Sequence, residues 1–250
     1  MNLALSREFK NDLHDLDIVF KESLLPWWDD INGYIKELEN DVTWTTLPLM
    51  TMGVYSFLGL DRKISVSMAN IFRTLFFANY IHALVKDDNE GQEYNRELQF
   101  SILIGDYIFG RMLKLLVEAE ADSLVGIFAE MMGEINEGMI LKHKYGADCR
   151  QVLSKTRAPL YARAFETAAR LASLGGELEN IYRQLGFALG MCIELPPYES
   201  RAAEIQNYIH EGEKIFSQLQ QKNGAKNNSL GKMIAELHCL FCSVDEFAVV

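Results

Sequence analysis

Hydrophobic residues recur at intervals of three and four positions along almost the whole chain, which is the spacing of one face of an α-helix. Residues 1–40 follow this pattern as far as Pro26-Trp27-Trp28, where proline interrupts it, and the pattern resumes at Ile31. Almost no segment alternates polar and apolar residues with the period of two that a β-strand shows. The pattern therefore predicts an all-α fold.

Two strongly apolar segments in the first half of the chain predict buried helices. Residues 45–60 are almost wholly apolar, and their helix is expected to end near Gly59 and Asp61. Residues 64–85 carry aromatic side chains at helical spacing, which are usual in a core and also suit the wall of a cavity for a long apolar ligand. Further helices are expected over residues 100–118, 121–143, 150–174, 177–195, 201–219 and 230–240.

The composition suits a large core and narrows the class of ligand. Hydrophobic residues make up 49% of the chain and charged residues 24%, and no shift in composition marks a linker. We therefore expect one domain of roughly ten helices over residues 1–250, with N-terminal helices in 1–40 and C-terminal helices and a tail in 201–250. The net charge of -11 argues against nucleic acid as a partner, because phosphate contacts require a basic face. A diphosphate ligand stays open, because a metal ion or a lysine can reverse the local field.

The four cysteines form no disulfide framework, which is typical of a reducing compartment. The N-terminus lacks the pattern of a signal peptide, and no apolar run reaches the roughly 18 residues of a transmembrane helix. A cytoplasmic protein without a transmembrane segment is therefore expected. His238, Cys239 and Cys242 resemble half of a zinc site, but a second ligand pair is absent nearby, so we interpret the two cysteines as packing residues.

Two short polar clusters are candidates for the chemistry of a site. Asp87 and Asp88 follow the apolar segment 64–85, and Mg²⁺ prefers carboxylate oxygens together with substrate phosphates. One helical turn after Asp87 stands Gly91, so the spacing alone gives an incomplete metal-binding face, and adjacent acids at a helix end are commonly just solvated.

The second cluster is Lys155-Thr156, near the start of the helix predicted over residues 150–174. We expect the pair to open a helix, where it is suited to contact a phosphate with the help of the free N–H groups and the helix dipole. An ordinary surface lysine is the simpler interpretation.

Five segments together resemble the trans-isoprenyl diphosphate synthases in their order and spacing. They are ALVKDD (83–88), ILIGDYIFGRMLKLL (102–116), GEINEG (133–138), LSKTRAPLYARAFETAARLASL (153–174) and YRQLGFALGMCIEL (182–195). The resemblance covers roughly Thr45 to Leu195. It implies an isoprenoid-synthase-like bundle around a central apolar cavity, a first aspartate motif at Asp87-Asp88, a helix that opens with Gly105-Asp106-Tyr107, and magnesium ions that neutralise a departing diphosphate.

The chain departs from the family pattern at its charged positions. The basic stretch expected near Glu39–Pro48 reads ENDVTWTTLP, so the isopentenyl diphosphate site looks lost. In the second aspartate motif the two leading aspartates fall on Ile193 and Glu194, and the last falls on Pro197. A diphosphate without its charge partners would cost several kcal/mol per unpaired ion in an apolar pocket. We therefore expect that the chain does not elongate prenyl chains unaided.

The length, the stretch INEGMILKHKYG and residues 201–238 are similar to the small component of two-component bacterial synthases, the heptaprenyl diphosphate synthase component 1 type. This resemblance implies a non-catalytic or weakly active regulatory subunit that forms a heterodimer with a catalytic large subunit and helps make the menaquinone side-chain precursor. It also implies an isoprenoid diphosphate or chain in the cavity. The interface would involve the helices around Phe100–Leu116 and Leu124–Ile140, and a homodimer in isolation is left open.

A self-associating lipid-binding protein that uses the cavity without chemistry is one alternative, and an active but divergent enzyme is the other. In that hypothesis a magnesium-dependent prenyltransferase or terpene-synthase-like protein acts on an allylic diphosphate. The resemblance then implies that Asp87, Asp88 and Glu194 hold Mg²⁺, and that Lys155 and Thr156 contact the substrate.

Overall fold

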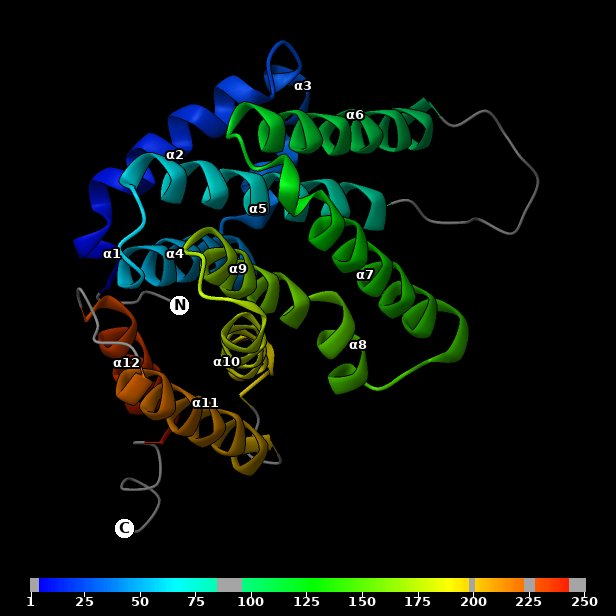
Figure 1. Cartoon of the computed structure of the whole chain (residues 1–250). Coiled ribbons are helices and arrows are strands. Elements are labelled where there is room, and N and C mark those ends of the chain that lie inside the picture. Colours follow the sequence, from blue (N-terminus) through cyan, green and yellow to red (C-terminus); the bar gives the residue numbers. More distant parts are fainter. Residues whose placement is uncertain (1–4, 85–95, 198–200, 223–227, 243–250) are drawn as a thin grey trace.

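The computed structural model describes residues 5–84, 96–197, 201–222 and 228–242. These residues form helices joined by short turns, with no β-strand among them, which confirms the predicted all-α fold (Figure 1). The helices are α1 (Leu5–Glu8), α2 (Lys10–Ser23), α3 (Trp28–Leu38), α4 (Val42–Phe57), α5 (Arg62–Ala83), α6 (Arg96–Glu118), the 3-10 helix η1 (Asp122–Leu124), α7 (Val125–Tyr145), α8 (Cys149–Thr156), α9 (Ala158–Leu171), α10 (Gly176–Glu194), α11 (Ala202–Lys222) and α12 (Ser229–Cys242).

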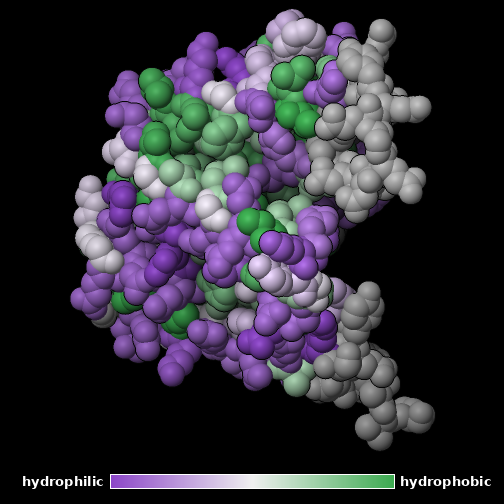
Figure 2. Space-filling view, turned by 90° about the vertical axis from the view of Figure 1, so that its right-hand side faces the viewer, coloured by the Kyte–Doolittle hydropathy of each residue, from purple (hydrophilic) through white to green (hydrophobic). Residues whose placement is uncertain are grey.

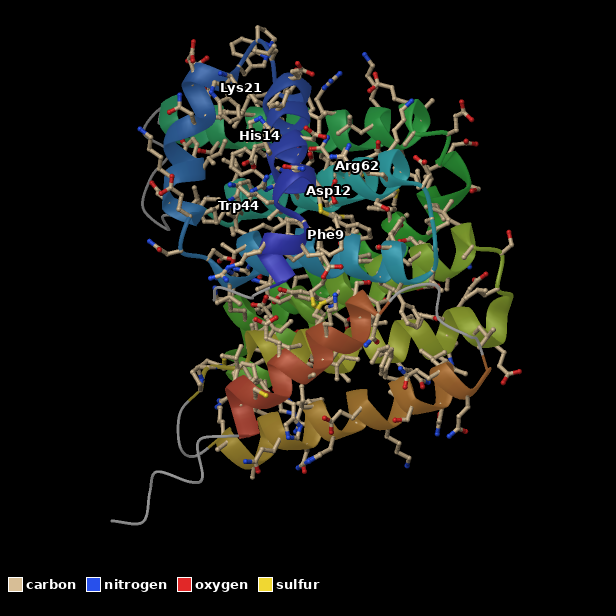
Figure 3. The ribbon with its side chains drawn as sticks, turned by 90° about the vertical axis from the view of Figure 1, so that its left-hand side faces the viewer. Phe9, Asp12, His14, Lys21, Trp44 and Arg62 are labelled. Atoms are coloured by element: carbon tan, nitrogen blue, oxygen red, sulfur yellow. The ribbon has the colours of Figure 1, made fainter. Side chains whose placement is uncertain are left out.

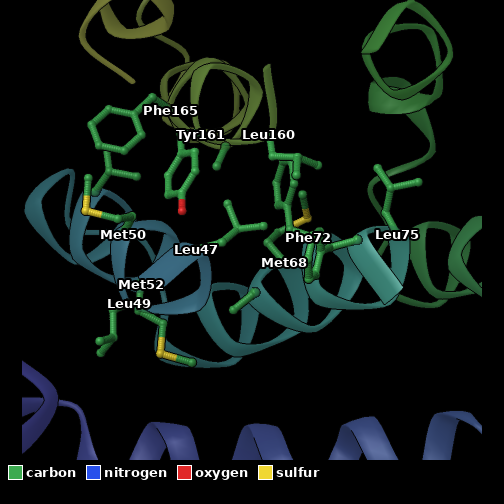
Figure 4. Close-up of a cluster of buried hydrophobic side chains, with 14 of the residues drawn as sticks. Leu47, Leu49, Met50, Met52, Met68, Phe72, Leu75, Leu160, Tyr161 and Phe165 are labelled. Carbon is green, nitrogen blue, oxygen red and sulfur yellow. The ribbon is translucent and has the colours of Figure 1, made fainter. Parts of the chain in front are cut away.

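The helix α4 is buried along almost its whole length. Its sequence is apolar around the helix, so it has no polar face to turn toward water. The side chain of Asp41 caps its first turn by accepting a hydrogen bond from the backbone N–H of Trp44 at 3.1 Å. Toward the inside, Leu47 and Met50 face Tyr161 and Phe165 of α9 (Figure 4). The helix predicted over residues 45–60 is therefore a core helix.

The helices α9 and α10 pack more closely than ordinary side chains would allow. A Cβ added to Gly186 of α10 would lie 2.5 Å from the carbonyl oxygen of Tyr161 and 2.9 Å from the Cβ of Phe165. A Cβ added to Gly190 would lie 2.8 Å from the Tyr161 ring. Two glycines one turn apart thus let α10 approach the backbone of α9, with buried alanines on the facing helix.

The helix α2 lies against α5 and is fixed there by charged pairs. The guanidinium of Arg62 donates to the carboxylates of Asp12 and Asp15 (Figure 3). Further along α5, Arg73 donates to Asp17 at 2.6 Å and stacks over the ring of Trp44, 4.3 Å from its centroid. These pairs hold α2 over a cluster of aromatic side chains.

Two predicted helix boundaries are wrong. Residues 150–174 form two helices, α8 and α9, because the chain turns at Arg157 and Pro159 stands in the first turn of α9, where its missing N–H does no harm. The helix α6 begins at Arg96, so Gly105 lies inside it and does not open it. Within the described ranges, no helix is long and apolar enough to cross a membrane.

Candidate functional site

A cavity of about 650 Å³ opens between α5, α7, α8 and the first turn of α9. Apolar side chains such as Phe76, Ile135 and Leu160 line it, together with Thr156 and Arg157. It agrees with the expected apolar cavity inside a helical bundle. A second hollow of about 710 Å³ lies between α2, α5 and α6 and contains none of the predicted site residues.

The aspartates of the first motif lie outside the described residues. The described part of α5 ends at Ala83, with Leu84 as its C-cap, and Asp87 and Asp88 follow. Both Ala83 and His82 line the cavity, so the chain leaves α5 at the cavity edge. The assignment of Asp87 and Asp88 as metal ligands stays a prediction.

Lys155 and Thr156 end the helix α8 and do not open one. The helix begins at Cys149, where Asp148 caps it by accepting from the N–H of Gln151 at 2.9 Å. The Lys155 ammonium pairs with Glu137 of α7 at 2.9 Å, and the Thr156 hydroxyl donates to the carbonyl of Val152 at 2.8 Å. Because the carbonyl end of a helix disfavours anions, the helix dipole gives no help to a phosphate here. The pair remains a predicted contact for substrate through its side chains only.

Gly138 allows α8 to pack closely against α7. A Cβ added to Gly138 would lie 2.6 Å from Cγ2 of Thr156 and 2.7 Å from the Cβ of Lys155. We expect Gly138→Ala to lower the free energy of unfolding by about 1–2 kcal/mol, because α8 must shift away from α7. Urea unfolding measures this, with Gly133→Ala of the same helix as the control. No atom lies within 4 Å of a Cβ at Gly133, so that variant should gain stability, and equal effects of the two variants would contradict the close contact.

Glu194, the last residue of α10, is the centre of a buried hydrogen-bond network. Its Oε1 accepts from the hydroxyls of Thr43 and Tyr161, each at 2.6 Å. Arg157 donates to Oγ1 of Thr43 at 2.7 Å and to both carboxylate oxygens of Asp41 at 3.2–3.3 Å. The network joins the start of α4, the turn between α8 and α9, and the end of α10.

Burial raises the pKa of two groups in this network, the carboxyl of Glu194 and the phenol of Tyr161. Desolvation raises the pKa of the Glu194 carboxyl above its usual value, although Arg157 and the hydroxyls of Thr43 and Tyr161 act in the opposite direction. Desolvation also raises the pKa of Tyr161, and the charge of Glu194 adds to this effect. The phenol of Tyr161 is therefore neutral at ordinary pH and serves as a hydrogen-bond donor.

The surroundings of Glu194 do not fit a divalent cation. One carboxylate oxygen is already held by two hydroxyls, and the guanidinium of Arg157 lies close enough to influence the carboxyl. The neighbouring positions Ile193 and Pro197 offer no oxygen ligand in their side chains. In the described part of the chain, no group of three or more acidic, histidine or cysteine residues is arranged to hold a metal ion. With Asp87 and Asp88 outside that part, the magnesium site stays a prediction.

The motif Gly105-Asp106-Tyr107 positions a wall of the cavity. A Cβ at Gly105 would lie 2.7 Å from Nε2 of His82, so the imidazole rests directly on the backbone of α6. The carboxylate of Asp106 lies 3.3 Å from the same nitrogen, and the Tyr107 hydroxyl donates to the carbonyl of Leu25 at 2.9 Å. The motif thus fixes the side chain of His82 against the cavity.

The residues that the sequence did not single out are Asp41, Thr43, Tyr161 and Arg157. The local sequence marks two of these residues as lying at the start of a helix. Asp41 precedes a helix in the position of an N-cap, and Arg157 precedes the Ala-Pro that begins α9. Neither signal shows that the two side chains meet.

The fold is that of the trans-prenyl diphosphate synthases. Similar solved structures are a decaprenyl diphosphate synthase from Rhodobacter capsulatus (TM-score 0.74, 13% identity, covering 96% of this chain and 98% of that one) and a polyprenyl synthase from Caulobacter crescentus CB15 complexed with calcium and isoprenyl diphosphate (TM-score 0.73, 16% identity, 93% and 95%). A third is the geranyl diphosphate synthase small subunit from Antirrhinum majus (TM-score 0.59, 15% identity, 88% and 98%). Neither a protein-family model nor a curated protein sequence matches this chain.

Proposed function

We propose that this chain is the small, non-catalytic or weakly active subunit of a heteromeric long-chain prenyl diphosphate synthase, of the heptaprenyl type that supplies the menaquinone side chain. The observation that carries the proposal is the pairing of the charged groups around the cavity. Arg157 is bound to Asp41 and Thr43, Lys155 is bound to Glu137, and Glu194 is held by hydroxyls. Each of these groups already has a partner, which weakens its attraction for a diphosphate or its metal ion.

An exposed apolar surface on α6 and α7 supports a protein partner. Figure 2 shows hydrophobic side chains gathered on part of the molecular surface. The large hydrophobic side chains exposed on the described parts of the two helices are Ile102, Leu103, Leu113, Val117, Val125, Ile140 and Tyr145. Leu103, Leu113 and Val117 share one face of α6 by helical spacing, and Val117 is 63% exposed. Apolar side chains clustered in this way are typical of a protein–protein interface.

The likeness to a small subunit of a geranyl diphosphate synthase agrees with this role. In the proposal the α6–α7 surface contacts the catalytic large subunit, and the chain stabilises that subunit and influences product length. Because Arg157, Lys155 and Glu194 are paired within this chain, the chemistry would belong to the partner.

The test is co-expression with a candidate catalytic subunit, followed by an assay of isopentenyl and farnesyl diphosphate incorporation. We expect the double variant Leu113→Asp/Val117→Asp to lose co-purification and to reduce activation of the partner by about tenfold or more, because two charges would be buried in an apolar interface. Leu240→Asp is the matched control, since Leu240 is 46% exposed on α12, away from this surface.

Two outcomes would count against the proposal. Long-chain synthesis by this chain alone, abolished by Asp87→Ala, would support the divergent magnesium-dependent enzyme. A catalytic subunit whose activity is the same with and without this chain would remove the regulatory role.

A further inference from the structure

The hollow of about 710 Å³ between α2, α5 and the C-terminal half of α6, called here the α2–α5–α6 hollow, is separate from the cavity between α5, α7 and α8. The two share no lining residue. Apolar side chains from all three helices form part of the wall of the hollow, among them Val19 of α2, Val66 of α5 and Leu115 of α6. Its volume falls within the roughly 300–1,000 Å³ usual for ligand sites, so a small molecule would fit there.

Asn70 of α5 lies in the wall of this hollow and carries an unpaired polar atom. The residue is only 3% exposed, and its Oδ1 has no hydrogen-bond partner. A buried amide oxygen that receives no hydrogen bond destabilises the fold, because it has lost its water and gained no donor in return. Rotation of the amide about its last bond would turn this oxygen toward the hollow. The position therefore suits a ligand that brings an N–H donor.

Arg111 of α6 offers a cation to the same hollow. Its Nε donates to the backbone carbonyl of Ser23 at 2.7 Å, which fixes the guanidinium between α6 and the end of α2. No carboxylate among the described residues forms an ion pair with Arg111, so its two terminal nitrogens remain available as donors. Lys63, also in the lining and without an ion pair to a described residue, adds a second positive charge. A guanidinium held in this way can donate two parallel hydrogen bonds to a carboxylate.

Glu22 of α2 supplies the opposite charge. It is exposed, lies in the lining, and has no ion-pair partner within the described ranges. The other acids of the lining are engaged, since Asp15 pairs with the arginine that begins α5, Asp61 caps α5, and Glu118 pairs with a lysine one turn away. The hollow thus combines an available carboxylate with an available guanidinium, and apolar surface lies beside them.

We propose that the α2–α5–α6 hollow binds a small zwitterion of the α-amino-acid type with an apolar side chain. The guanidinium of Arg111 holds the carboxylate of the ligand. Asn70 and Glu22 accept hydrogen bonds from its ammonium group, and its apolar side chain packs on Val19 and Leu115. The site goes beyond the proposed subunit role, because neither the cavity between α5, α7 and α8 nor the α6–α7 surface takes part in it.

The site and the proposed partner surface lie on different sides of α6. Arg111 and Leu115 of the hollow are each two positions before Leu113 and Val117 of the partner surface. Two positions correspond to about 200° around an α-helix. A ligand in the hollow would therefore leave the partner surface open, and its binding can be measured on this chain alone.

Calorimetry of the full chain with L-phenylalanine tests the site. Phenylalanine methyl ester lacks the carboxylate charge and N-acetylphenylalanine lacks the ammonium group, so each should bind about tenfold more weakly or worse. Thermal unfolding provides a second readout. A ligand that binds the folded chain alone raises the unfolding midpoint, and phenylalanine should do so more than either derivative.

Two variants locate the ligand. Asn70→Leu should weaken phenylalanine binding by about tenfold and leave the thermal stability of the ligand-free chain unchanged or higher, because leucine removes the unpaired amide. Glu22→Gln should weaken binding by about threefold, which is the effect of an exposed charge. Glu39→Gln removes an equally exposed charge at the end of α3, outside the lining, and is the control.

Absence of phenylalanine binding would overturn the proposal. Equal binding of the methyl ester or of N-acetylphenylalanine would do the same, because one of the two charged contacts would then be missing. Binding that Asn70→Leu leaves unchanged would place the ligand elsewhere and would also reject the site. Activation of a catalytic partner is a separate measurement, so its failure bears on the subunit role alone.

Discussion

Gly186→Ala is expected to lower the free energy of unfolding by about 2–3 kcal/mol. The new Cβ would lie 2.5 Å from the carbonyl oxygen of Tyr161, and a backbone atom has no rotamer through which to move aside. The helices α9 and α10 would have to separate, and the better helix propensity of alanine, worth about 1 kcal/mol, offsets only part of the loss. For a chain of this size, thermal unfolding should shift downward by roughly 4–10 °C.

The matched control for Gly186→Ala is Gly33→Ala in α3. Gly33 is exposed within a helix, and no atom lies within 4 Å of its added Cβ, so this variant should gain up to about 1 kcal/mol. Circular dichroism during urea and thermal unfolding measures both variants. If Gly186→Ala were as stable as the parent, the close contact between α9 and α10 would be wrong.

The close packing of α9 against α10 also affects the candidate site. Tyr161 faces Gly186 and Gly190 with its backbone and ring, and its hydroxyl donates to Glu194 at the end of the same α10. A shift of α9 from α10 would lengthen that hydrogen bond. The packing of small residues therefore determines the geometry of the buried network.

The sequence is most informative where the residues of a single helix show whether that helix is buried. The segment 45–60 is apolar on all sides of the helix, which predicts that the helix is buried. The helix α4, which contains most of this segment, is indeed buried. The stretch 150–174 was misread because its apolar spacing continues across Arg157. Pro159 fits the first turn of a new helix as well as the interior of a disturbed one, so the sequence does not show that the chain turns at Arg157.

The candidate site was harder to predict because its members come from distant parts of the chain. Thr43 and Glu194 are 151 positions apart, and Arg157 and Asp41 are 116 positions apart. The resemblance drew attention to Glu194 as a metal ligand, whereas its partners are two hydroxyls. No local sequence pattern predicts such partners. A threonine in an apolar helix can also donate its hydroxyl to a backbone carbonyl of the same helix, as Thr51 does to Leu47.

Glu194→Ala and Glu194→Gln are expected to differ strongly. Alanine removes the acceptor of the Thr43 and Tyr161 hydroxyls in a buried space, and Thr46 at 2.7 Å remains as a partner for Tyr161 alone, so the free energy of unfolding should fall by about 1–3 kcal/mol. Glutamine retains an acceptor oxygen of similar position and carries no charge. The two variants therefore separate the hydrogen bonds of the network from the charge of the carboxylate.

The pH dependence of stability tests the role of the charge on Glu194, and the direction of the effect can be predicted. Because burial raises the pKa of Glu194 in the folded protein, the folded state keeps its proton to a higher pH than the unfolded chain does. The contribution of Glu194 to stability is then full below the unfolded pKa and declines as the pH rises through the folded pKa. Glutamine has no proton to lose, so Glu194→Gln should gain stability relative to the parent as the pH rises through this window.

Urea unfolding between about pH 4 and pH 8 measures this difference. Glu211→Gln, a substitution of an exposed carboxylate on α11, is the control and should follow the parent at every pH. A difference between the parent and Glu194→Gln that stays constant with pH would mean that Glu194 is not buried as a raised-pKa carboxyl. The charge of Arg157 and the hydrogen bonds from Thr43 and Tyr161, which lower the pKa of this carboxyl, would then offset the desolvation that raises it.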